Sequence, residues 1–99
     1  MNAIEFKEAR ESARIVRDQA IAAAEAAFET AFHASDEAYM EASEYLDSEI
    51  AEQDEEIERL QVVCVEAYAA ADTVRELAIM SAHTAYDEIV ETALAAALG

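Results

Sequence analysis

Proline is absent from this chain of 99 residues, and its one glycine is the last residue, Gly99. Because glycine and proline mark most turns and end most helices, a chain without them in its interior has few tight turns. Tryptophan is also absent, and cysteine and lysine occur once each, as Cys64 and Lys7. A lone cysteine forms no internal disulfide. We interpret Cys64, flanked by valines, as a small buried apolar residue in a reducing compartment.

Long apolar segments are missing as well. No run approaches the roughly 20 apolar residues that a membrane-spanning helix needs. The N-terminal residues lack the apolar core of a signal peptide, so we expect a cytoplasmic protein. Glycine-rich loops that hold nucleotide phosphates are excluded, because the chain has no internal glycine to build them.

The residues that carry catalysis or bind metals are few. His33, His83 and Cys64 provide too few ligands for the usual zinc sites. Carboxylates do stand near the histidines at multiples of four residues, namely Glu25, Glu29, Glu37 and Glu41 near His33, and Asp87 and Glu91 after His83. Such spacing arises by chance on any acidic helix, so we interpret both histidines as surface residues. We predict no metal, no cofactor and no enzymatic activity, since no set of catalytic groups converges.

The residues that are present favour helices. Ala, Glu, Leu, Arg and Met fill most positions, and no stretch alternates long enough between apolar and polar residues to form a sheet. Asn2 with Glu5, and Thr73 with Glu76, have the spacing of a helix capping box. Ser35 has the character of an N-cap residue. We therefore predict helices over 3–33, 36–71 and 73–97.

These three helices predict an all-α fold, an antiparallel three-helix bundle that forms a single acidic domain over 1–99. A long helical hairpin that dimerises is the alternative, and a kink or break near Asp47–Ser48 is a further one. Two apolar patterns define the expected helix contacts. Small residues recur along the first helix at Ala9, Ala13, Val16, Ala20, Ala24, Ala27 and Ala31. The middle segment has heptad-like spacing at Tyr39, Ala42, Leu46, Ile50, Ile57, Leu60, Cys64 and Tyr68.

The formal net charge of −17 is unevenly distributed. Positive and negative charges balance over residues 1–19, whereas residues 20–58 carry thirteen acidic side chains and no basic one. Residues 59–99 carry six acidic and two basic side chains. A solvated helix face or an adaptation to high salt would account for many acids, and a functional acidic surface is the other interpretation. Salt adaptation would spread the acids more evenly than they are.

The acidic middle segment predicts a partner-binding surface. Its members are Asp36, Glu37, Glu41, Glu44, Asp47, Glu52, Asp54, Glu55 and Glu58. A straight helix from Glu37 to Glu58 would be about 33 Å long at roughly 1.5 Å per residue. This length is close to one turn of B-DNA, about 34 Å. Ten carboxylates lie in this span, and one DNA strand would place about ten phosphates there.

In size, charge and this acidic segment from Asp36 to Glu58, the chain resembles the small acidic helical inhibitors of bacteriophages, including anti-CRISPR and anti-restriction proteins. The resemblance implies a protein that occupies the DNA-binding groove of another protein and inhibits that protein. The predicted partner is a basic protein surface of a nucleic-acid-binding complex, with no direct contact to nucleic acid or membrane. The alternative function is a structural or adaptor bundle that self-assembles or docks a partner helix, for instance as a homodimer.

Overall fold

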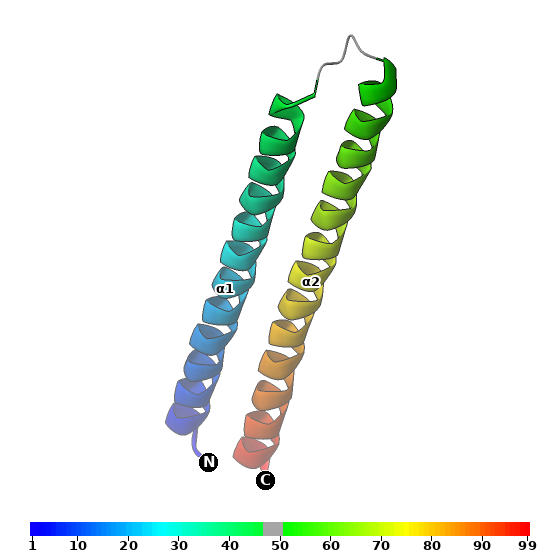
Figure 1. Cartoon of the computed structure of the whole chain (residues 1–99). Coiled ribbons are helices and arrows are strands. Elements are labelled where there is room, and N and C mark those ends of the chain that lie inside the picture. The colour runs from blue at the N-terminus through cyan, green and yellow to red at the C-terminus, as the bar shows by residue number, and fades with distance from the viewer. Residues whose placement is uncertain (47–50) are drawn as a thin grey trace. The chain divides into compact units, whose positions relative to one another are not determined.

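The computed structural model describes residues 1–46 and 51–99, and contains two helices, α1 (Ala3–Glu44) and α2 (Ala51–Leu98) (Figure 1). For residues 51 and 52 the backbone alone is described. The described residues contain no strand, which confirms the all-α prediction. The described residues do not show the predicted three-helix bundle, and their two helices fit the alternative, a helical hairpin, better. Over the same residues, neither helix has a segment that is both long and apolar enough to cross a membrane.

Two of the predicted helix breaks do not occur. Ser35 lies inside α1, where its hydroxyl donates a hydrogen bond to the Cys64 Sγ at 3.5 Å. Thr73 lies inside α2, and its hydroxyl donates to the carbonyl of Ala69 at 3.0 Å. Serine and threonine end a helix when they bond to free backbone groups, but here both hydroxyls are satisfied within the packed helices. Because no glycine or proline lies near Ser35 or Thr73, both helices continue through these positions.

The helix ends agree better with the sequence. The backbone N–H of Glu5 donates to the Asn2 Oδ1 at 2.8 Å, which confirms Asn2 as the N-cap of α1. After α1 ends at Glu44, the N–H of Leu46 donates to the carbonyl of Ser43 at 3.1 Å. The break proposed near Asp47–Ser48 falls outside the described residues.

The chain divides into two compact units. Unit 1 comprises Met1–Glu25 and Glu76–Gly99, and unit 2 comprises Ala26–Arg75. Within each unit, a segment of α1 packs beside an antiparallel segment of α2 (Figure 1). Among the described residues only alanines are buried, and all of them belong to unit 1: Ala13, Ala24, Ala82 and Ala93. Val16, Ala20, Ala27 and Ala31, predicted to lie on the apolar face of the first helix, are exposed.

Buried and half-buried residues of α2 recur at intervals of three, four and four residues. The residues that follow this spacing are Ile57, Leu60, Cys64, Tyr68, Ala71, Arg75, Ile79, Ala82, Tyr86, Val90, Ala93 and Ala97, and the half-buried Gln53, Glu56 and Asp72 fall outside it. The pattern therefore repeats every eleven residues, or about 3.67 residues per turn, and not every seven as the heptad-like spacing indicated. Because this period is close to the 3.6 residues of an ordinary α-helix, the contact face drifts little along α2.

Candidate functional site

Three of the predicted partner-binding residues lie on the outer face of α1. Glu37, Glu41 and Glu44 are exposed, whereas Tyr39 and Ala42 are half-buried and mark the face of α1 that packs on α2. At 3.6 residues per turn, the three glutamates fall on the side of α1 turned away from α2. They can therefore contact a partner without disturbing the helix pair.

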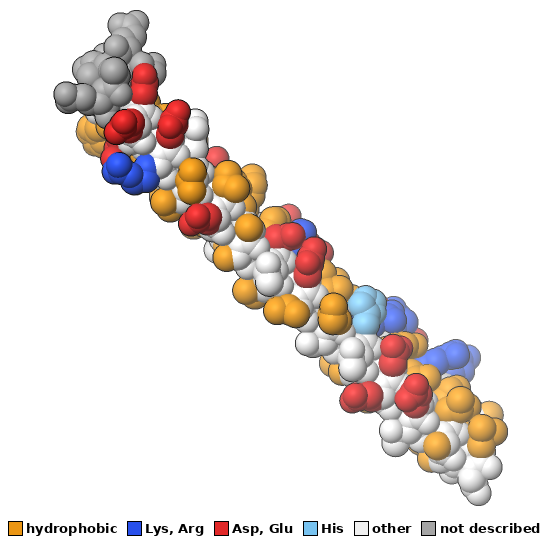
Figure 2. Space-filling model, turned by 90° about the vertical axis from the view of Figure 1, so that its right-hand side faces the viewer, with side chains coloured by type: hydrophobic (Ala, Val, Ile, Leu, Met, Phe, Trp, Pro, Cys, Tyr) orange, Lys and Arg blue, Asp and Glu red, His pale blue; other side chains and the backbone are white. Residues whose placement is uncertain are grey.

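Three more predicted residues are exposed near the beginning of α2, namely Asp54, Glu55 and Glu58. Ile57 and Leu60 are half-buried and mark the face of α2 that packs on α1. Glu55 and Glu58 therefore point away from α1. Figure 2 shows acidic side chains gathered beside the residues that are drawn in grey. We call the set Glu37, Glu41, Glu44, Asp54, Glu55 and Glu58 the acidic end of unit 2.

The single straight stripe from Glu37 to Glu58 is wrong. Its length assumed one continuous helix, but α1 ends at Glu44 and α2 begins at Ala51. Because the chain reverses between the two helices, the acids form two patches on faces that point away from each other. Of the remaining predicted residues, Asp47 lies outside the described residues, and Glu52 lies in α2 with its side chain not described.

Asp36 differs from the other predicted residues because it faces the second helix. It is half-buried, and its Oδ1 accepts a hydrogen bond from the Tyr68 hydroxyl at 3.3 Å. A hydrogen bond with the Cys64 thiol, burial, and the Asp36 charge together raise the pKa of Tyr68 above its usual range. Asp36 thus stabilises the contact between the helices, and it keeps the Tyr68 phenol protonated.

Further contacts of unit 2 surround this pair. The Gln61 Nε2 donates to the Tyr39 Oη at 3.3 Å, and the ring of Phe32 stacks on that of Tyr68 with centroids 4.6 Å apart. Together with Asp36, Cys64 and Val65, the residues Tyr39, Gln61 and Tyr68 line a groove of about 400 Å³. Cys64, predicted to be buried, is half-buried. This cluster holds the two helices of unit 2 together, and composition alone gave no sign of it.

Few cations oppose the acidic end. Unit 2 carries fourteen acidic side chains and two arginines, Arg59 and Arg75. Arg59 pairs with Glu56, and Arg75 pairs with Asp72. Within the part of the chain that the structure describes, none of the six acidic-end carboxylates makes a hydrogen bond or an ion pair. The acidic end therefore presents carboxylates that are not paired with any other described group of the chain.

The histidines show no sign of a metal centre. His33 packs edge-on against Phe32, with ring centroids 5.7 Å apart. Over residues 1–46 and 51–99, no three His, Cys, Asp or Glu side chains converge closely enough to hold a metal ion. The sequence pattern around His33 therefore does not become a cluster in space.

Comparison with known proteins gives no further guide. No protein-family model, no curated protein and no solved structure matches the chain.

Proposed function

We propose that this chain is a binding protein whose acidic end of unit 2 occupies a basic groove of a partner protein, a groove that otherwise holds nucleic acid. Occupation of the groove inhibits the partner by excluding its nucleic acid. The chain needs no catalytic group for this role, and its contribution is the placement of negative charge.

One observation carries the proposal: six exposed carboxylates near the ends of α1 and α2 make no hydrogen bond or ion pair with any described residue. Self-repulsion of this kind destabilises the compact state, so a partner that neutralises it gains affinity. Nucleic-acid-binding grooves supply lysine and arginine side chains that neutralise phosphates, and the same side chains can pair with carboxylates.

The arrangement of the acids on two faces suits an enclosing groove better than a flat surface. A duplex carries phosphates on both strands, and a protein that surrounds it meets negative charge from more than one side. Glu37, Glu41 and Glu44 present charge on the outer face of α1, while Glu55 and Glu58 do so on that of α2. The opposite walls of a groove can each contact one of these patches.

Charge reversal tests this function. We expect the quadruple variant Glu41→Lys, Glu44→Lys, Glu55→Lys and Glu58→Lys to bind the partner about a thousandfold more weakly, a loss on the order of 4 kcal/mol. Immobilised wild-type protein is incubated with a nuclease-treated bacterial lysate at low salt, and retained proteins are eluted with duplex DNA. Proteins that are eluted by DNA should be missing from the same experiment with the quadruple variant.

A matched control carries the same number of reversals in unit 1, at the exposed residues Glu76, Asp87, Glu88 and Glu91. It changes the net charge equally, so it should retain the DNA-eluted proteins if position matters. Equal loss with both variants, or retention with the acidic-end variant, contradicts the proposal. Circular dichroism at 222 nm verifies that all variants keep their helices.

A further inference from the structure

The two sides of the helix pair in unit 2 differ in charge. One side has the groove that Asp36, Gln61 and Val65 line. The other side has a second groove, which Ala38, Leu60 and Val63 line. Tyr39 and Cys64 line both grooves and therefore lie between them. The first side carries the hydrogen bonds of Tyr68 with Asp36 and of Gln61 with Tyr39. The second side is lined by uncharged side chains, among them Ser35, which donates to Cys64.

This difference follows the eleven-residue period of the helices. Steps of eleven along the uncharged side give Val16, Ala27 and Ala38 on α1, and Val63, Val74 and Ala85 on α2. Steps of eleven along the opposite side give Arg14, Glu25 and Asp36 on α1, and Gln61, Asp72 and His83 on α2. We call the side of each unit that contains the first set the uncharged face.

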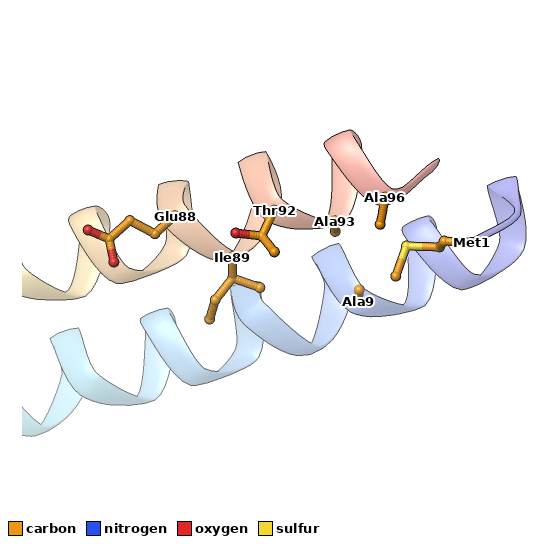
Figure 3. A pocket seen from close by; sticks show the side chains of 7 residues that line it. All are labelled: Met1, Ala9, Glu88, Ile89, Thr92, Ala93 and Ala96. Carbon is orange, nitrogen blue, oxygen red and sulfur yellow. The ribbon is translucent and has the colours of Figure 1, made fainter. Parts of the chain in front are cut away.

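Unit 1 has an uncharged face of the same kind. Ala9 of α1 and Ile89, Ala93 and Ala96 of α2 line a groove there of about 460 Å³, with Met1 at its edge (Figure 3). Figure 3 shows the side chain of Glu88 extending away from Ala9 and Met1, so the one carboxylate in the lining leaves that part of the groove apolar. Val16 and Ile89 are both exposed on this face.

The chain exposes more surface than a folded monomer of its size usually does. Its accessible area is 7209 Å², and its mass is 10.8 kDa. The usual area for a monomer of this mass is about 5,500 Å², so the chain exposes roughly 1,700 Å² in excess. A stable protein interface covers about 800 Å² on each partner. The excess is about twice that area, and it lies within the roughly 1,000–2,500 Å² that each partner buries in an obligate homodimer.

We infer that a second copy of this chain covers the uncharged face, so that two helix pairs associate through their alanine- and valine-rich sides. A basic partner would find no carboxylate to pair with there. A second copy instead offers the same small side chains, which allow helices to approach closely. The same patch on both copies makes an isologous contact, the commonest arrangement in homo-oligomers.

The net charge of −17 opposes self-association, but the geometry limits the penalty. The positions of the uncharged face recur every eleven residues, and none of them holds a charged residue between residues 9 and 38 of α1 or between 60 and 96 of α2. Repulsion between copies thus acts from the other faces and is largely screened beyond about 10 Å at 0.1 M salt. Salt should therefore strengthen this contact, whereas it weakens the capture of a basic groove by the acidic end.

Sedimentation velocity measures the association directly. At about 50 μM protein and about 0.3 M salt, where screening is strong, we expect a mass twice that of the 10.8 kDa chain. The double variant Val63→Lys and Ile89→Lys should sediment as a single chain, with the dimer dissociation constant raised at least about a hundredfold.

The chain offers closely matched controls on the opposite side. Val65 is 64% exposed against 57% for Val63, and Leu94 is 44% exposed against 45% for Ile89. The double variant Val65→Lys and Leu94→Lys adds the same charge and should remain a dimer. If lysine reduces the helical signal at 222 nm, serine at the same two pairs of positions gives the same comparison with a milder change.

A wild-type chain that sediments as a monomer at both low and high salt overturns the inference. Equal dissociation by the two double variants also overturns it, because the contact would then not be specific to the uncharged face. Neither outcome bears on the acidic end, whose charge-reversal variant leaves the uncharged face intact.

Discussion

Units 1 and 2 are built from the same two helices but are stabilised differently. Unit 1 contains the buried alanines, and it sets nine acidic side chains against four basic ones. Unit 2 has no buried residue among those described, holds its helices together with aromatic stacking and hydrogen bonds between side chains, and sets fourteen acidic side chains against two basic ones.

The difference shows how an acidic chain can remain folded. Each unit places one arginine over an aromatic ring across the helix pair, Arg17 over Tyr86 in unit 1 and Arg75 over Phe28 in unit 2. Beyond that shared contact, unit 1 relies on close packing of small side chains, which needs no charge. Unit 2 relies on polar contacts between its helices, and its unpaired acids point outward.

The largest expected effect concerns the packing of unit 1. Replacing the buried Ala13 with Leu should destabilise the chain by about 2 kcal/mol, because there is no room for three more carbon atoms. Ala22→Leu, at an exposed position on the same helix, should change stability little. Urea denaturation measures both. Equal tolerance of the two substitutions would show that unit 1 is not closely packed.

The next largest effect on stability concerns the tyrosine hydroxyl groups, which among the described residues make a hydrogen bond between the helices in unit 2 but not in unit 1. Tyr68→Phe removes the hydroxyl that bonds to Asp36, and should lower the melting temperature by about 5 °C, the usual effect of losing one hydrogen bond in a chain of this length. The hydroxyl of Tyr86 makes no hydrogen bond within the described part of the chain, so Tyr86→Phe should have a smaller effect.

The raised pKa of Tyr68 adds a dependence on pH to the same comparison. A group whose pKa is raised in the folded state stabilises the fold below its unfolded pKa, about 10 for tyrosine, and loses this contribution as pH rises through the folded value. The stability of the wild-type chain should therefore fall above about pH 10. This part of the fall should be missing in Tyr68→Phe, and an identical alkaline profile would contradict the role of Tyr68.

A smaller effect on stability is expected at two residues of the acidic end, one at the end of α1 and one at the beginning of α2. Glu44 is the last residue of α1, where the helix dipole disfavours negative charge, and Asp54 lies in the first turn of α2, where the dipole favours it. Glu44→Lys should raise stability by about 0.5 kcal/mol, and Asp54→Lys should lower it by a similar amount. Thermal denaturation should show melting temperatures of the two variants that shift in opposite directions. Shifts in the same direction would exclude the helix dipole as the cause.

The smallest effect concerns the charge balance of unit 1. A hydrogen bond from Arg14, together with the positive charges of Arg14, Arg10 and Lys7, lowers the pKa of Glu11 below 4.5. Its contribution to stability is present above about pH 4.5 and is lost as pH falls through the lowered value. A carboxyl NMR titration should show this low pKa, and Arg14→Gln should raise it toward the usual value. An unchanged titration in the variant would exclude Arg14 as the cause.

The sequence predicted secondary structure better than it predicted where the helices end. Helix-favouring composition and the Asn2 cap were sufficient for the all-α fold and the beginning of α1. Ser35 and Thr73 were misleading, because a capping residue and a residue satisfied inside a helix have the same identity in sequence. Which of the two interpretations holds depends on the group that accepts the hydrogen bond of the hydroxyl. Local sequence does not show that group.

The predicted partner-binding residues differ in their surroundings. Glu37, Glu41, Glu44, Asp54, Glu55 and Glu58 are exposed, as a partner-binding surface requires. Asp36 differs because it contacts Tyr68, and that contact depends on chain reversal, which local sequence does not show. The uncharged face was missed, although steps of eleven residues through Val63, Val74 and Ala85 would have shown it. Steps of three and four residues belong to both the seven-residue and the eleven-residue period, so the heptad-like spacing did not distinguish them.

By itself the amino-acid sequence determined that this chain is helical, strongly acidic and poor in turn-forming residues. These properties follow from residue types and local spacing, which act within a few residues along one helix. Tertiary structure decided that the acids form two outward patches and that one side of each helix pair is uncharged. Both properties depend on which faces of α1 and α2 meet, and pairing of distant segments fixes that choice.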